Sequence, residues 1–414
     1  MSKRARSKLG FCCVLAVTAC GGVVIDSGQE QPSEAGGAGP SGVGAQPSGG
    51  LVSGAAGSHP IGIGGNPAGG EPLVDGGIGS PPVGGKSSGS GPRPSSGCGK
   101  PLPAQQVQTI PGSRTGYTEW NVDLKGENLG ALDPSRAGPR QFFVRVPLDY
   151  DSSKPYRLVY IGSGCGAQHA GKTNTSPLFN EAQGGSEQAV YVGLSVADNA
   201  VNPGCYDNNA GPQSQEWEAF EAIHTLVERS YCVDNDRIYV AGHSTGATLA
   251  NQWSCYFGGA SSPPLDQPDL EAGRATRKFA PQFAIRGALG VTGFLPRNQP
   301  KPCNGPAAHL WIHDLLDKSN LLNTEIDALD LALKTNGCTG SYADGPKRPW
   351  APAEAIAGLE GGICQEYTGC APDVAARYPI VFCSTTGYGH ADQAQRSIPA
   401  FTRFMEQVDA AAPE

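Results

Sequence analysis

A serine between two glycines, in the segment GHSTG at residues 242–246, has the surroundings that nucleophilic chemistry needs. The apolar run before it predicts a buried strand, and the residues after it predict a helix. A tight turn between a strand and a helix brings backbone against backbone, which favours glycine on both sides of the residue at its apex. In such a nucleophile elbow the Ser244 hydroxyl is exposed at the strand's end, and the next N–H group faces a developing oxyanion. The alternative is that Ser244 only caps the helix.

Spacing alone does not identify this serine, because GKSSG at residues 85–89 repeats the same pattern. That second copy lies in a stretch made almost wholly of glycine, serine and proline, which predicts neither a strand nor a helix. Context therefore favours Ser244 as the nucleophile, provided that a base and an acid exist elsewhere in the chain.

Histidine is the side chain suited to remove a serine proton near neutral pH. Of the seven histidines, His390 follows the last predicted strand in a glycine-rich loop. The base belongs there if the chain order is serine, acid, histidine. We expect His224 at the surface or on the flank of a predicted helix. We also expect the ring of His243 to point away from its neighbour Ser244, since successive side chains of a strand alternate.

The base in turn needs a carboxylate that fixes its tautomer and stabilises the imidazolium. Between Ser244 and His390, the carboxylates at the end of a predicted strand are Asp314 and Asp317. Either of them could instead cap the helix that follows. The residues alone leave both open as the acid.

Segments that alternate between strand and helix fill the chain after residue 98. This alternation predicts an α/β fold with a mostly parallel sheet covered by helices on both faces. Ligands bind at the carboxyl ends of the strands in such sheets, and Ser244 sits at one of these ends. The strand-like segments are residues 141–147, 157–162, 189–195, 237–241, 285–291, 309–313 and 379–385. The helix-like segments are residues 214–231, 320–335 and 394–410, the last one kinked or interrupted by Pro399.

These segments resemble the secreted α/β-hydrolase esterases, a family that includes feruloyl esterases, acetylxylan esterases and polyhydroxybutyrate depolymerase-like proteins. The resemblance covers roughly residues 141–405, and its most specific part is YCVDNDRIYVAGHSTGA at residues 231–247. There Asp234 and Arg237 precede an apolar strand and the Gly-x-Ser-x-Gly motif. The family's His-Gly-x-x-Asp strand end is similar to the segment from His313 to Asp317, and its C-terminal Gly-His to residues 389–390.

The resemblance implies an α/β-hydrolase fold in which Ser244 is the nucleophile, His390 the base and Asp317 the acid. It also implies an oxyanion hole made by the N–H of Thr245 and an N–H near Cys165, and it requires no cofactor and no metal. Three departures stand out. Ser-Gly-Cys at residues 163–165 replaces the usual His-Gly-Cys, and an aspartate, Asp314, replaces the glycine after the strand-end histidine. The Trp-Pro that often follows the base in depolymerase-like members is missing.

The predicted function is therefore that of a serine carboxylic-ester hydrolase that acts through an acyl-enzyme on feruloyl or related plant-polysaccharide esters. A polyester depolymerase and an acetylxylan esterase are alternatives within the same chemistry. A peptidase on the same scaffold is a further one. The alternative from another class is a non-catalytic, hydrolase-like binding lipoprotein at the cell surface.

Three regions divide the chain by composition. Residues 1–19 join a basic start to an apolar run too short to span a bilayer, which predicts an export signal. Residues 20–97 are rich in glycine, serine and proline, and they cannot bury enough surface to offset the entropy of ordering. We expect them to be a disordered tether. Residues 98–414 are about as many as one hydrophobic core accommodates and form the predicted catalytic domain.

The end of the signal, VTAC at residues 17–20, resembles the lipobox of bacterial lipoproteins, in which Cys20 would carry the lipid. We expect an extracytoplasmic protein that is attached to a bacterial membrane only through this anchor and faces the periplasm or the exterior. The alternative is free secretion. The net charge of −8, without a basic cluster after the N-terminus, argues against nucleic acid as a partner.

Cysteine usage fits export. Cys12 and Cys13 leave with the predicted signal and Cys20 is the lipid candidate, so ten of the 13 cysteines remain. An even number in an oxidising compartment predicts five disulfides. One expected pair is Cys232 with Cys255, because a strand and the helix after its neighbouring turn lie side by side. The absence of a CxxC pair argues against zinc, and we expect a monomer.

Overall fold

The computed structural model describes the chain between residues 92 and 411, with gaps. The gaps are residues 105–106, 110–115, 126, 129–130, 133–136, 167–188, 197–203, 208–214, 260–264, 267–277, 280–283, 294–302, 304, 320–321, 357–358 and 360–361. The predicted export signal, Cys20, the predicted tether up to residue 91 and the second Gly-x-Ser-x-Gly copy lie outside the described residues.

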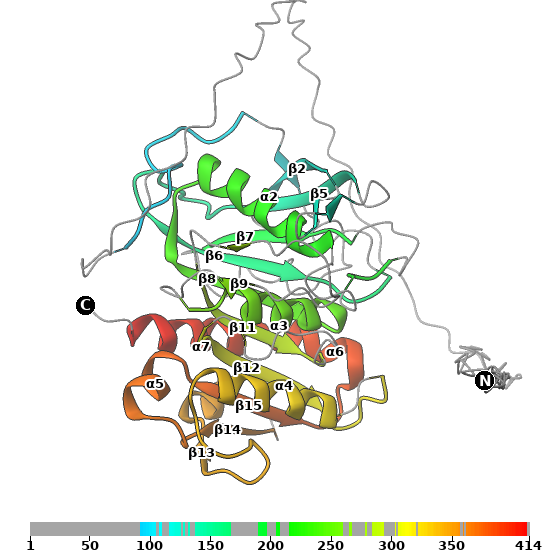
Figure 1. Cartoon of the computed structure of the whole chain (residues 1–414), viewed down its shortest axis with the longest axis vertical. Coiled ribbons are helices and arrows are strands. Elements are labelled where there is room, and N and C mark those ends of the chain that lie inside the picture. Colours follow the sequence, from blue (N-terminus) through cyan, green and yellow to red (C-terminus); the bar gives the residue numbers. More distant parts are fainter. Residues whose placement is uncertain are drawn as a thin grey trace, which may run out of the picture. The chain divides into compact units, whose positions relative to one another are not determined.

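Eleven strands of the described ranges form one mixed sheet, in the order β1-β2-β5-β7-β6-β8-β11-β12-β15-β14-β13 (Figure 1). The block from β7 to β15 is parallel throughout, which confirms the prediction from the alternating segments. Its strands are β7 (Ala189–Leu194), β6 (Tyr156–Gly162), β8 (Val233–His243), β11 (Ile285–Val291), β12 (Ala308–Asp314) and β15 (Ile380–Thr385). The remaining predicted strand is β5 (Gly138–Arg145), which is antiparallel to β7.

Both edges of the sheet are antiparallel. They consist of β1 (Val107–Thr109) and β2 (Gly116–Leu124) beside β5, and of β14 (Ile363–Tyr367) and β13 (Lys347–Pro349) beside β15. Two small ribbons complete the strands, β3 (Glu127–Asn128) with β4 (Ala131–Leu132) and β9 (Leu265–Asp266) with β10 (Lys278–Phe279).

Helices cover both faces of the parallel block. On one face lie α2 (Gln215–Ser230), α3 (Thr245–Phe257) and α4 (Leu322–Thr335), which stand in front of the sheet in Figure 1. The other face is packed by α7 (Ile398–Ala410) and by the 3₁₀ turn η5 (Ala351–Ala355). The predicted C-terminal helix is two helices, α6 (Gly389–Arg396) and α7, because Pro399 occupies the first turn of α7 and interrupts the segment. A short helix, α5 (Pro372–Arg377), precedes β15.

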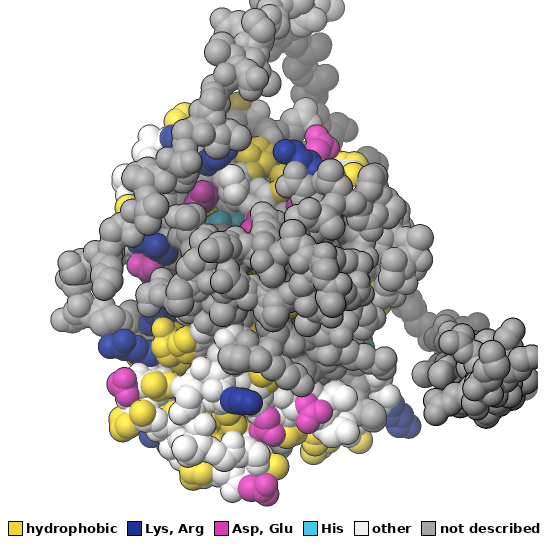
Figure 2. Space-filling model, viewed as in Figure 1, with side chains coloured by type: hydrophobic (Ala, Val, Ile, Leu, Met, Phe, Trp, Pro, Cys, Tyr) yellow, Lys and Arg dark blue, Asp and Glu magenta, His cyan; other side chains and the backbone are white. Residues whose placement is uncertain are grey.

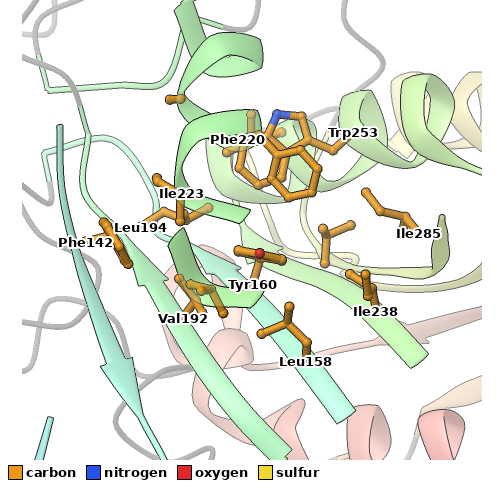
Figure 3. Packing of buried hydrophobic residues seen from close by; sticks show 14 of the residues in the cluster. Phe142, Leu158, Tyr160, Val192, Leu194, Phe220, Ile223, Ile238, Trp253 and Ile285 are labelled. Carbon is orange, nitrogen blue, oxygen red and sulfur yellow. The ribbon is translucent and has the colours of Figure 1, made fainter. Parts of the chain in front are cut away.

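Side chains of the central strands alternate between two cores. Leu158 and Tyr160 of β6 pack under α2 and α3, whereas Val159 and Ile161 face α7. Helix α2 places its apolar residues at helical spacing, and Figure 3 shows Phe220 near Tyr160 of β6 and Ile223 near Leu194 of β7. Every residue of β6 is buried, which is typical of a parallel strand covered on both sides.

His224 lies inside the core under α2, so the prediction that it would sit at the surface or on the flank of the helix is wrong. Its ring is 2 % exposed and its Nδ1 is 2.8 Å from the hydroxyl of Tyr160. The hydrogen bond explains the burial, because a polar ring that finds a partner inside the core no longer needs water.

Five disulfides link the ten remaining cysteines, as the even count predicted. The predicted pair Cys232–Cys255 is wrong. Cys232 precedes β8 and pairs with Cys98, whose segment packs at the amino end of this strand. Cys255 pairs with Cys303 because α3 runs back over β11 toward the segment before β12. The other pairs are Cys165–Cys205, Cys338–Cys370 and Cys364–Cys383.

The Asp234 and Arg237 of the sequence motif fasten the amino end of β8. The carboxylate of Asp234 accepts hydrogen bonds from Arg237 Nε at 2.7 Å and from the backbone N–H of Arg93 at 3.0 Å. Arg237 also donates to the carbonyl of Pro155 at 3.0 Å. The motif is therefore a structural clasp at the end of the strand opposite to Ser244.

No helix within the described ranges is long and apolar enough to cross a membrane. On the face shown in Figure 2, acidic and basic side chains are interspersed with hydrophobic ones over the part of the surface near α4 and β13.

Candidate active site

Ser244 sits at a sharp turn between β8 and α3. Its backbone has φ 56° and ψ −121°, a conformation that residues other than glycine rarely adopt. The turn is held on both sides, since Ser244 N–H donates to the carbonyl of Val291 at 2.9 Å and its carbonyl accepts from Thr248 N–H at 3.1 Å. The hydroxyl makes no capping hydrogen bond to α3. The geometry therefore favours the nucleophile elbow over the helix cap.

The two glycines of the elbow, Gly242 and Gly246, are needed because backbone packs directly against backbone at this turn, as the sequence predicted. A Cβ on Gly242 would lie 2.2 Å from the carbonyl of Gly246, and a Cβ on Gly246 would lie 2.4 Å from the carbonyl of Gly162. Both distances are far shorter than real carbon contacts allow. The close approach lets α3 start directly at the carboxyl end of β8, with Ser244 at the apex.

His390 and Asp317 form a hydrogen-bonded pair. Asp317 lies in the turn after β12 and His390 at the start of α6, and the His390 Nδ1 to Asp317 Oδ2 distance is 2.8 Å. The Asp317 side chain is 0 % exposed and the His390 side chain is 26 % exposed. Because a carboxylate only accepts, Nδ1 carries the proton, and the other ring nitrogen of a neutral His390 is left as an acceptor. This is the arrangement that a general base needs.

Asp314, the other candidate acid, has different partners. Its carboxylate accepts from the backbone N–H of Leu316 and of Tyr388, both at 2.9 Å, and from the Thr385 hydroxyl at 3.1 Å. Burial alone would raise the pKa of Asp314, but these hydrogen bonds, the one from Tyr388 foremost, hold it below its ordinary value. Asp314 therefore fastens the loop that leads to His390, whereas Asp317 contacts the histidine itself.

His243, whose ring was expected to point away from its neighbour Ser244, faces His390. The two rings are 4.6 Å apart between centroids, and His243 Nε2 is 2.7 Å from the backbone carbonyl of His390. Alternation of side chains holds along an extended strand, but Ser244 leaves the extended conformation at positive φ. The sequence signal that could have found this contact is a polar ring in the last strand position before the elbow.

The segment from Ser163 to Cys165, which follows β6, packs against the elbow. Cys165 Sγ lies 3.6 Å from Thr245 Oγ1, and Cys165 is bonded to Cys205. A Cβ on Gly164 would come within 3.3 Å of the Ser244 Cβ. Ser163 N–H donates to the Tyr206 hydroxyl at 3.1 Å, which fixes the start of this candidate oxyanion loop. The structure thus places both candidate oxyanion residues, Thr245 and Cys165, beside Ser244.

Loss of the disulfide Cys165–Cys205 should lower kcat, and a control disulfide can separate this loss from the effect on stability. Replacing both cysteines by alanine should lower kcat roughly tenfold or more, because a displaced oxyanion donor costs on the order of 100- to 1,000-fold. The matched control replaces Cys338 and Cys370. Their sequence separation of 32 is close to the 40 of the first pair, so the loss of chain-entropy stabilisation is similar.

The measurement is kcat on an aryl acetate together with the midpoint of thermal unfolding for both double variants. Equal losses of kcat in the two variants would show that the effect on turnover is only a general loss of stability.

A second pair of an acid and a histidine is buried within electrostatic range of Asp317, and the sequence patterns named His313 but not its partner Glu325. His313 Nδ1 of β12 is 3.0 Å from Glu325 Oε1 of α4, and both side chains are almost fully buried. Burial raises the pKa of Glu325 to about 7. Burial alone would lower the pKa of His313, but the hydrogen bond and the negative charge of Glu325 outweigh it and raise that pKa. The pair therefore retains protons in the folded state that the unfolded chain would release.

This retention predicts a pH-dependent stability. Both pKa values are raised on folding. The contribution of Glu325 is fully present below its ordinary value of 4.5 and is lost as the pH rises through about 7, whereas that of His313 is fully present below its ordinary value of 6.5 and is lost as the pH rises through its raised pKa. The advantage of the wild type over Glu325→Gln should therefore shrink between roughly pH 5 and pH 8. Thermal unfolding midpoints at each pH measure it. Asp327→Asn, the same change at an exposed position of α4, should show a constant difference, and a widening gap for Glu325→Gln would contradict the assignment.

The strand order, the sharp turn at Ser244 after β8, the aspartate after β12 and the histidine after β15 together define the α/β-hydrolase fold. The predicted fold is thereby confirmed. The three candidate residues of the triad follow three strands of the same parallel block and lie at its carboxyl end, where ligands bind in such sheets.

Comparison with known proteins gives distant likenesses. No protein-family profile matches the chain. Probable feruloyl esterase C of Aspergillus terreus is 23 % identical over 214 residues, which are 50 % of this chain and 66 % of that protein. Feruloyl esterase C of Emericella nidulans is 23 % identical over 262 residues, which are 61 % of this chain and 76 % of that protein. The chain thus spans just under two thirds of the length of the Aspergillus terreus relative.

Among solved structures, a ferulic acid esterase from Anaeromyces mucronatus in complex with ferulic acid is 14 % identical with a TM-score of 0.37. The match covers 75 % of this chain and 97 % of that one. The chain has the α/β-hydrolase fold, and the named relatives that it resembles are esterases.

Proposed function

We propose that the chain is a serine carboxylic-ester hydrolase with Ser244 as nucleophile, His390 as base and Asp317 as acid. The observation that carries the proposal is the 2.8 Å contact between His390 and Asp317, at the same end of the sheet as a serine in a strained elbow. His243, the immediate neighbour of that serine, contacts His390 directly. If Ser244 only capped a helix and His390 only lay in a surface loop, neither the strained turn nor the contacts of His390 would be required.

The reaction proceeds in two halves. Ser244 Oγ attacks the carbonyl carbon of the ester while the unprotonated ring nitrogen of His390 takes the hydroxyl proton. The oxyanion accepts hydrogen bonds from the N–H groups of Thr245 and Cys165. The bond to the leaving alcohol then breaks, and His390 returns the proton to the alcohol oxygen. Water attacks the acyl-enzyme with His390 again as base, which releases the carboxylic acid and restores Ser244.

The substrate class follows from the relatives. The two fungal proteins are named feruloyl esterases, and this likeness supports feruloyl or related plant-polysaccharide esters for the present chain. Acetylxylan and polyester substrates belong to the same chemistry. The missing Trp-Pro after His390 argues against the polyester.

The proposed location is outside the cytoplasm, with the enzyme anchored through a lipid on Cys20 or else secreted. Five disulfides support an oxidising compartment, since such bonds persist there and are rare in the cytosol. The glycine-rich segment between Cys20 and the domain would serve as a flexible tether.

A fluorophosphonate probe tests the proposed chemistry, because only an activated serine reacts with it. We expect stoichiometric labelling of the full chain, mapped to Ser244 by peptide mass. A panel of feruloylated, acetylated and hydroxybutyrate esters together with peptide amides then ranks the substrate classes. Absence of labelling in folded protein would favour the non-catalytic binding protein, and preferential cleavage of amides would favour a peptidase.

A further inference from the structure

We propose that His243 is a positioning residue that holds the backbone of His390 in place for catalysis. The inference rests on the proposed function of the site. It assigns to the second residue of the GHSTG segment a role that the triad and the oxyanion hole do not include.

The loop that carries His390 needs anchors. Gly387 and Gly389 have φ angles of 102° and 64°, so the backbone before the histidine runs through conformations open mainly to glycine. One anchor is Asp314, which accepts from the N–H of Tyr388 at 2.9 Å. The other is His243, whose Nε2 is 2.7 Å from the carbonyl of His390. The carboxyl ends of two strands of the parallel block, β12 and β8, thus hold the loop on either side of Gly389, at Tyr388 and at His390.

The contact with the His390 carbonyl defines the protonation state of the His243 ring. A backbone carbonyl only accepts, so Nε2 carries the proton. Burial, and then the neighbouring His390, lower the pKa of His243 to about 4. The neutral ring suits its place, because His390 becomes positively charged in every acylation step and an imidazolium with its centroid 4.6 Å away would oppose that charge.

The other side of the ring faces the oxyanion loop. A Cβ on Gly164 would lie 3.2 Å from His243 Nδ1, so the absence of a side chain at this position gives the ring its room. His243 therefore fills the space between the loop of Cys165 and the loop of His390, with Ser244 next to it in the chain. A change at this position should disturb the alignment of base and nucleophile more than the binding of the ester.

Two substitutions separate the hydrogen bond from the bulk of the ring. Glutamine can place an amide N–H near the position of Nε2, whereas phenylalanine keeps a ring but has no donor. We expect His243→Gln to retain kcat within roughly threefold, as one hydrogen bond of altered geometry would allow. We expect His243→Phe to lose kcat roughly ten- to a hundredfold with KM nearly unchanged, because a displacement of about 1 Å can cost on the order of a hundredfold.

The assay uses the full chain with an aryl acetate, and fluorophosphonate labelling rates are measured per folded protein. His243→Met, which also lacks a donor, replaces the phenylalanine variant if that protein does not fold. If the variants without a donor match or exceed His243→Gln, the ring only packs and the inference is overturned. If the wild type itself is not labelled, the proposed function fails, and that outcome is distinct from the failure of this inference.

Discussion

Replacing Ser244 by alanine should lower ester turnover roughly a millionfold, since removing a triad nucleophile in serine hydrolases costs about that much. The fold should survive. The backbone of the elbow is held by Val291 and by Thr248 rather than by the Ser244 hydroxyl, and alanine tolerates the positive φ no worse than serine. Thermal unfolding and turnover of an aryl ester measure the two expectations.

A matched control is Ser254→Ala on the same helix. The Ser254 hydroxyl donates to the carbonyl of Asn251 at 2.9 Å, within α3. This variant should keep its fluorophosphonate labelling, whereas Ser244→Ala should lose it. Near-normal turnover by Ser244→Ala would dismiss the nucleophile assignment and with it the proposed mechanism.

The second large effect is expected at the acid. Asp317→Asn should lower kcat by roughly ten-thousandfold, because the amide no longer selects the tautomer in which the catalytic ring nitrogen accepts a proton. The side chain is fully buried against His390, so water cannot replace the lost carboxylate. The pH profile of kcat/KM should change with it, since the base loses the charge that stabilises its imidazolium.

Asp314→Asn is the comparison that decides between the two aspartates. Its carboxylate fastens Tyr388, Leu316 and Thr385, so its loss should act mainly on stability. We expect a lower unfolding midpoint and a much smaller loss of kcat than for Asp317→Asn, both measured at a temperature where the variant is folded. A larger loss of kcat from Asp314→Asn would reverse the assignment.

The parallel part of the sheet was predictable because its strands are buried on both faces. Such strands appear in the sequence as unbroken apolar runs, for instance the fully buried β6. The edge strand β2, GYTEWNVDL, mixes polar with apolar residues and was not predicted. It pairs on one side with β5 and on the other with a three-residue strand, so its polar side chains keep access to water.

The candidate nucleophile and base could be named from the sequence because their positions follow from chain order and glycine spacing. The choice between Asp314 and Asp317 rested on a family resemblance, since both follow the same strand within three residues. The cysteine partners and the contact of His243 with His390 depend on where distant segments meet. No local pattern records that information, and the mistaken pairing of Cys232 with Cys255 shows the limit of reasoning from neighbouring elements.

The contacts of Asp234 and Arg237 at the start of β8 bear on how a bulky substrate would reach the candidate active site. Residues 93–98 join the domain beside Val233, through a bridge from Pro94 to Asp234 and through the bond from Cys98 to Cys232. The strand then runs eleven residues to Ser244, about 35 Å at the usual rise. Any chain segment before residue 93 would thus join the domain at the amino end of β8, which is the end away from Ser244. If Cys20 carries the proposed lipid, long or insoluble substrate chains would reach Ser244 from the end of the strand that lies away from the attachment point.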